Sequence, residues 1–84
     1  MKNTCKNIRE DVTDMALEQH TWGSLLVGIK DYKVDVDRQR NPPANNGWLL
    51  RCKGTGVVSG GSDQSITYGI VIQSGETDIK YQAN

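Results

Sequence analysis

The sequence contains no phenylalanine, one histidine, two cysteines and no long apolar run. Without phenylalanine, the core must be built mainly from isoleucine, valine and leucine, and a chain of 84 residues buries only a modest share of its surface on folding. No apolar stretch has the length of a membrane span or of a secretory segment, so we expect neither. Ten basic residues balance ten acidic ones, which argues against disorder driven by net charge. We therefore predict one small globular domain over residues 1–84.

The two cysteines and the single histidine do not form a recognisable metal or redox motif. Cys5 and Cys52 lack the C-x-x-C spacing of redox and zinc sites, and His20 alone cannot complete a structural zinc set. With no targeting segment, the expected compartment is the cytoplasm, where thiols stay reduced. We therefore expect both cysteines to be free, with Cys5 at a fraying terminus and Cys52 buried as a small apolar side chain. His20 is interpreted as a helix C-terminal cation.

Two other patterns resemble functional motifs but lack the residues or the spacing that those motifs require. Gly54 and Gly56, followed by Gly60-Gly61, lack the lysine and the following helix that a phosphate-binding loop requires. Asp35 and Asp37 alternate with valines as in a strand, whereas calcium loops need several oxygen ligands and a glycine turn. We predict no catalytic residue, no metal and no cofactor, and so a protein that is not an enzyme.

The first segment has the periodicity of an amphipathic helix. Apolar residues from Cys5 onward recur at spacings of i, i+3, i+4 and i+7, while acidic residues such as Asp11 and Asp14 project from the other side. Asn3 or Thr4 can cap its start, and Gly23 can adopt the left-handed conformation that closes a helix. The helix is expected to end near His20.

From Ser24 onward the apolar period changes to two, which is typical of β-strands. The apolar phase slips by one residue between Ile29 and Tyr32. Because Lys30-Asp31 is poor chemistry for a two-residue hairpin turn, we predict one long strand bent by a β-bulge at this point. The segment 39–47, with two prolines and a glycine, is predicted to be a loop, and its part Asn41–Gly47 is expected to be mobile.

Three further alternating segments begin near Trp48, Ile66 and Thr77, with glycine-containing turns between them. Gly54 and Gly56 indicate a place where another group packs closely on the backbone. Strands joined by turns rather than by helices imply an antiparallel sheet. The predicted fold class is α+β, with one N-terminal amphipathic helix packed on a roughly four-stranded antiparallel sheet in the order helix-β-β-β-β. The residues expected in the core are Ile8, Val12, Met15, Leu25, Val27, Trp48, Leu50, Ile66, Tyr68, Ile70 and Ile72.

Charge is unevenly distributed although the net charge is zero. Residues 30–53 carry six basic and three acidic side chains, a net of +3, and Trp48 lies within this segment. The residues proposed to contact a partner are Trp48, Arg38, Arg40, Arg51 and Lys53. A sheet with one helix leaves a face or an edge strand available, so the first hypothesis is a small non-enzymatic protein-binding or adaptor module, including one that acts as a homodimer.

Two alternatives remain open. A nucleic-acid-binding module would combine the basic segment 30–53 with stacking on Trp48, but the isoelectric point of about 6.5 and the absence of known binding motifs place it second. A small-ligand or carbohydrate site around the tryptophan and tyrosine residues ranks third. No membrane partner is expected.

Overall fold

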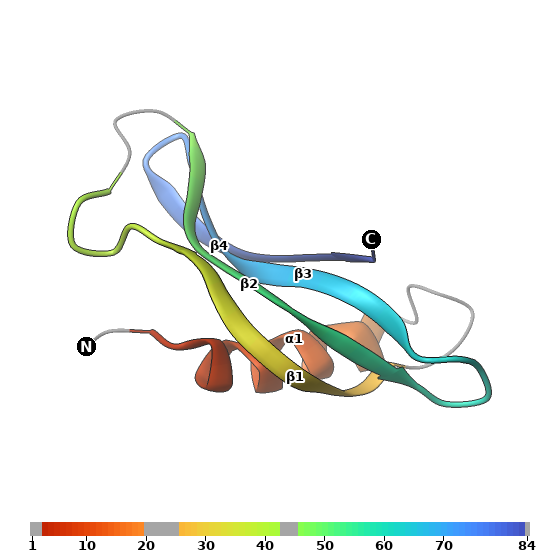
Figure 1. The fold of residues 1–84 in the computed structure, drawn as a ribbon. Coiled ribbons are helices and arrows are strands. Elements are labelled where there is room, and N and C mark those ends of the chain that lie inside the picture. The colour runs from red at the N-terminus through yellow and green to blue at the C-terminus, as the bar shows by residue number, and fades with distance from the viewer. Residues whose placement is uncertain (1–2, 20–25, 43–45, 84) are drawn as a thin grey trace.

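The computed structural model describes residues 3–19, 26–42 and 46–83. Its elements are α1 (Cys5–Gln19), β1 (Leu26–Asp37), β2 (Gly47–Val58), β3 (Gln64–Gln73) and β4 (Glu76–Ala83). The strands form one antiparallel sheet in sequence order, and α1 packs on one face of it, chiefly against β1 (Figure 1). The predicted α+β fold and its helix-β-β-β-β order are confirmed.

Helix α1 starts at a capped residue and docks through a single apolar stripe. The backbone N–H of Asn7 donates to Oγ1 of Thr4 at 3.1 Å, which confirms Thr4 as the N-cap. Ile8, Val12 and Ala16 on the same stripe are buried, whereas Met15 is only half-buried. The predicted closure at His20 to Gly23 lies outside the described residues.

Strand β1 is one long strand bent by bulges, as the slipping apolar phase predicts. Its pairing with β2 shifts register between Lys30 and Lys33, and Asp31 has a φ of 54°. A second shift, between Leu26 and Gly28, was not expected. It allows both Leu26 and Ile29 to face the helix and turns Val27 outward, where Val27 is 49% exposed. The prediction that Val27 belongs to the core is therefore wrong, and Leu25 lies outside the described residues.

The paired glycines of β2 lie where other groups pack closely on the backbone. A Cβ on Gly54 would lie 3.0 Å from Cγ2 of Ile29, and a Cβ on Gly56 would lie 2.9 Å from Cδ1 of Leu26. The close approach predicted from these glycines is confirmed. In the next turn Gly60 has a φ of +79°, a left-handed conformation that glycine adopts without steric cost. Part of the predicted 39–47 loop, residues 43–45, lies outside the described residues.

A disulfide between Cys5 and Cys52 crosses the core. Both cysteines are buried, so the expectation of free thiols, with Cys5 at a fraying terminus, is wrong. The two residues are 47 positions apart in sequence, and only the docking of α1 on β2 brings them together. Cys5 opens the helix on its buried stripe, and Cys52 lies on the strand face that meets it.

The rest of the core surrounds this disulfide. Tyr68 is the largest of the fully buried side chains, followed by Leu26 and Leu50, also on the strands. Its hydroxyl donates a hydrogen bond of 3.0 Å to the backbone carbonyl of Cys5. Trp48 and Ile72, which the alternating pattern assigns to the core, are only half-buried. The buried apolar residues are Cys5, Ile8, Val12, Ala16, Leu26, Ile29, Leu50, Cys52, Val58, Ile66, Tyr68 and Ile70.

Candidate partner-binding face

The face of the sheet opposite α1, called here the outer face, carries three of the five predicted contact residues. Directly paired residues on neighbouring strands share a face of the sheet. Trp48 pairs with Val71, Arg51 with Gly69 and Lys53 with Thr67, and all three β3 partners alternate with the core residues Tyr68 and Ile70. Trp48, Arg51 and Lys53 therefore project from the outer face.

A β-bulge in β2 places Trp48 on this face. The pairing of β2 with β3 shifts by one residue between Trp48 and Leu50. Without that shift, Trp48 and Leu50 would lie on the same face, as strict alternation of side chains requires. The extra residue, Leu49, separates them, so Leu50 is buried under α1 and Trp48 faces outward.

Trp48 borders a shallow hollow of about 270 Å³. Val71 and Ile72 contribute apolar surface to the hollow, and Asn46 and Gln73 contribute amide groups. Lys80, from β4, places its Nζ 6.0 Å from the centroid of the Trp48 ring, within the range of a cation–π interaction. The hollow thus combines an aromatic wall with polar groups at its margin.

The basic residues beside Trp48 are already in contact with a carboxylate. Nε of Arg51 lies 2.5 Å from Oδ2 of Asp35, and Nζ of Lys53 lies 3.9 Å from the same oxygen. Asp35 comes from β1, and its side chain is 29% exposed. Part of the positive charge predicted for segment 30–53 is therefore neutralised within the sheet.

The remaining two predicted contact residues are placed differently. The backbone N–H of Arg38 donates to the carbonyl oxygen of Leu49 at 2.7 Å. Arg38 therefore lies next to Leu49, which directly follows Trp48 on β2. Arg40 lies beyond the end of β1 in an irregular segment, and its side chain is exposed. The structure groups Trp48, Arg51 and Lys53, leaves Arg38 at their border and places Arg40 outside the sheet.

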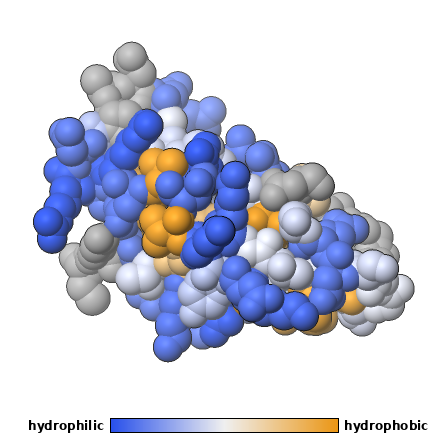
Figure 2. All heavy atoms as spheres, in the orientation of Figure 1, coloured by the Kyte–Doolittle hydropathy of each residue, from blue (hydrophilic) through white to orange (hydrophobic). Residues whose placement is uncertain are grey.

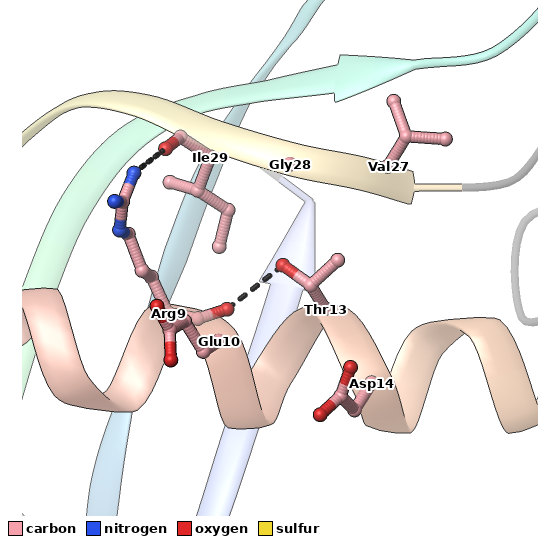
Figure 3. A pocket seen from close by; sticks show the side chains of 7 residues that line it. All are labelled: Arg9, Glu10, Thr13, Asp14, Val27, Gly28 and Ile29. Carbon is pink, nitrogen blue, oxygen red and sulfur yellow. Dashed lines mark hydrogen bonds between the residues drawn. The ribbon is translucent and has the colours of Figure 1, made fainter.

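A second hollow, of about 340 Å³, lies between α1 and β1 (Figure 3). Arg9 reaches from the helix to the strand, where its Nη1 donates to the carbonyl oxygen of Ile29 at 3.1 Å, while its guanidinium carbon lies 5.0 Å from the Tyr32 ring centroid. The Thr13 hydroxyl donates to the backbone carbonyl of Arg9 at 2.8 Å. Figure 3 shows Val27 turned away from the helix. Arg9 thus joins the helix to the strand at this hollow.

Tyr68 is the described group with a clear pKa shift. The pKa of its hydroxyl is raised to about 12, first by burial and then by the nearby Tyr32, while the Arg9 guanidinium opposes both effects. The hydroxyl lies in the core, bonded to the Cys5 carbonyl, and not on the outer face. The raised pKa of Tyr68 therefore reflects the burial of its hydroxyl in the core.

Two residues of the outer face, Asp35 and Lys80, are not among the five contact residues predicted from the sequence. Asp35 was interpreted as part of a solvated strand face, and Lys80 was not singled out. Their positions depend on the register of β1 against β2 and of β4 against β3. The available signal was strand alternation, which indicates the face of a residue within its own strand but not its neighbours on other strands.

The remaining surface has little exposed apolar area. Among the described residues, the exposed large apolar side chains are Val27 and Val34, both on β1, which are 49% and 55% exposed. Figure 2 shows a largely hydrophilic surface in which apolar atoms gather in one main patch near the middle of the view. Within the described ranges, no three histidine, cysteine or acidic side chains lie together as metal ligands, and no helix is long and apolar enough to cross a membrane.

Fold and face together define a small α+β domain with one helix-covered sheet face and one open face. Comparison of the chain with protein-family models, with curated proteins and with solved structures finds no match.

Proposed function

We propose that this chain is a small, non-enzymatic protein-binding module that uses its outer face around Trp48. The observation that carries this proposal is the pairing of Arg51 and Lys53 with Asp35, beside an aromatic wall. Tryptophan and arginine are enriched among the residues that dominate protein–protein interfaces. A carboxylate within the basic cluster weakens its attraction for phosphates, whereas a protein partner can accommodate charges of both signs.

The test compares three forms of the protein as baits for extracts of the source cells: wild type, Trp48→Ala and Thr55→Ala. Thr55 is a matched control, because it lies on the same strand and pairs with Lys30 and Ser65, away from the hollow. We expect a protein retained by wild type and by Thr55→Ala but not by Trp48→Ala, provided that all three forms melt alike. Equal retention by all three forms would contradict binding through Trp48.

Nucleic-acid binding is the alternative, favoured by the joint placement of Trp48, Arg51 and Lys53 on one face. Titration with single- and double-stranded oligonucleotides at low salt distinguishes the two proposals. We expect only weak non-specific binding. Submicromolar affinity that falls steeply with salt, and is lost when Arg38→Ala is combined with Arg51→Ala, would establish the alternative.

A small-ligand or carbohydrate site is the third proposal, and the amides of Asn46 and Gln73 beside the Trp48 ring favour it. The Asn46 amide oxygen already accepts the backbone N–H of Ser74 at 3.0 Å, which reduces what it can offer to a ligand. Binding of neutral oligosaccharides that is lost in Trp48→Ala would support this proposal over the first.

The compartment is part of the proposal. The expectation of a cytoplasmic protein went together with free thiols, and the Cys5–Cys52 disulfide does not fit that combination. Because disulfides persist in oxidising environments and are rare in the cytosol, the disulfide favours an oxidising compartment. Labelling of free thiols in protein taken from its source cells tests this directly: we expect no labelling before reduction and labelling of both cysteines after it.

A further inference from the structure

The two edge strands of the sheet differ in how well they could pair with another strand. β1 is interrupted by three register shifts, after Leu26, Lys30 and Val34. β4 pairs with β3 without any shift and contains no proline. Bulges are one way in which proteins protect a sheet edge from pairing with another chain, so β1 is protected and β4 is regular.

The turn before β4 determines which of its backbone groups face outward. Ser74 and Gly75 have φ values of 54° and 80°, as in a type I′ turn, whose outer residues Gln73 and Glu76 form a hydrogen-bonded pair. Hydrogen-bonded and non-bonded pairs alternate along an antiparallel ladder, so the backbone groups of Thr77 and Ile79 point away from β3. The N–H of Ile79 indeed donates to the Asp78 carboxylate, at 2.9 Å, instead of to a strand.

We infer that β4 pairs antiparallel with β4 of a second copy of this chain, with the two-fold axis at Ile79. In that register the Ile79 N–H leaves the Asp78 carboxylate, and Ile79 exchanges backbone hydrogen bonds with Ile79 of the other copy. Asp78 of each copy then lies opposite Lys80 of the other, and opposite charges at such cross-strand positions attract. Asp78 and Lys80 both lie on the outer face, opposite Val71 and Gly69 within their own sheet.

The other side of the β4 edge also accommodates a second strand. A hollow of about 370 Å³ lies between α1 and β4, where Ile8, Ile70 and Ile79 line it together with polar residues that include Asp11 and Asp78. Ile79 of the second copy would project on this same side and pack against the half-buried Ile79 of the first copy. The helix packs chiefly against β1 and contacts β4 less closely (Figure 1).

This inference goes beyond the proposed function, because binding of a partner at Trp48 does not require a second copy. The dimer would join two four-stranded sheets into one continuous sheet of both copies. Its interface is a single pair of strands, so a weak, concentration-dependent dimer is expected.

Sedimentation and light scattering from low to high micromolar concentrations test the pairing. We expect wild-type protein to move from the 9.3 kDa of one chain toward twice that mass as concentration rises. Asp78→Lys and Lys80→Asp should each raise the dissociation constant at least about tenfold, because two attractive pairs become repulsive. The double variant Asp78→Lys/Lys80→Asp should restore dimerisation, since the charges are exchanged and remain complementary.

Thr77→Pro gives an independent test of the backbone contribution. Proline is tolerated on an edge strand when its missing N–H faces solvent, so the monomer should fold while pairing is lost. Thr77→Ala keeps the N–H and is the control that should still dimerise. The inference is overturned if the chain keeps the mass of one copy at every concentration, or if the charge exchange fails to restore dimers that the single changes disrupt. It is likewise overturned if the edge captures an extended segment of another protein while the chain itself stays monomeric.

Discussion

At Gly69 the backbone of β3 has a φ of +156° and passes close against β2. A Cβ at this position would overlap the carbonyl oxygen of Leu50, the residue just after the bulge that turns Trp48 outward. The bulge in β2 and the absence of a side chain at Gly69 in β3 therefore depend on each other. Gly69 permits the register on which the outer face depends.

We predict that Gly69→Ala destabilises the protein by about 3 kcal/mol, because overpacking and an unfavourable φ act together. Thermal or urea unfolding measures the change. Gly28→Ala is the control, since Gly28 lies in β1 with nothing within 4 Å of an added Cβ, and it should leave stability unchanged or raise it slightly. Equal melting of the two variants would show that β3 does not approach β2 as described.

Tyr68 gives a prediction about pH. The pKa of its hydroxyl is raised to about 12 in the folded protein, chiefly by burial, whereas the ordinary pKa of a tyrosine is 10.0. The folded state therefore holds a proton that the unfolded state has lost between these values, so the free energy of unfolding falls as the pH rises from about 10 toward 12. The stabilising effect is fully present below pH 10.

Tyr68→Phe removes this titration and so should flatten the dependence of stability on pH above 10. At neutral pH it should cost about 1 kcal/mol, because the Cys5 carbonyl loses its hydrogen bond from the hydroxyl. Urea unfolding at several pH values measures both effects. If wild type and Tyr68→Phe show the same alkaline slope, Tyr68 is not buried as a neutral phenol.

At the scale of elements, the docking of α1 and the bulging of β1 can be tested with one kind of substitution. Val12 is fully buried on the helix stripe, whereas Val27 is 49% exposed on β1, although the apolar pattern assigns both to the core. Val12→Asp should cost several kcal/mol, which approaches the whole stability of a small domain, because it buries an unpaired charge. Val27→Asp should cost less than about 1 kcal/mol.

Circular dichroism during thermal unfolding distinguishes these outcomes. A large loss of stability in Val27→Asp would mean that β1 keeps strict alternation and that the first bulge is absent. A small loss in Val12→Asp would mean that α1 does not dock on the sheet through this stripe.

At the scale of the whole molecule, the disulfide ties the start of α1 to the centre of β2. It closes a loop with a sequence separation of 47 residues. In the chain-entropy model a loop of this length stabilises the folded state by roughly 4 kcal/mol. That is a large part of the stability that a domain of this size can have.

We predict that reduction lowers the melting temperature by roughly 15 °C or more, with the domain close to its stability limit at ambient temperature. A Cys5→Ala/Cys52→Ala variant should melt near the reduced protein and should not respond to the reductant. Identical melting of wild type with and without reductant would contradict the disulfide.

Most of the fold could be predicted from the sequence because its signals are local. The helical period from Cys5 onward, the capping residue Thr4 and the turn chemistry around Gly60 and Ser74-Gly75 each depend on neighbours along the chain. The phase slip before Tyr32 likewise revealed the bulge near Asp31, since a bulge shifts the apolar pattern by one residue. Antiparallel order followed from the short turns between strands.

Only the tertiary structure decided what depends on contacts between distant segments. The Cys5–Cys52 disulfide, the pairing of Arg51 with Asp35 and the contact of Lys80 with Trp48 each join residues on different elements. The bulges at Val27 and Leu49 produce no phase slip in the apolar pattern of the sequence. The side chains of Val27 and Trp48 were therefore assigned to the wrong face of the sheet. Register is determined by the packing of whole strands against each other and against the helix, and a shift of one residue there moves a side chain from the core to the outer face.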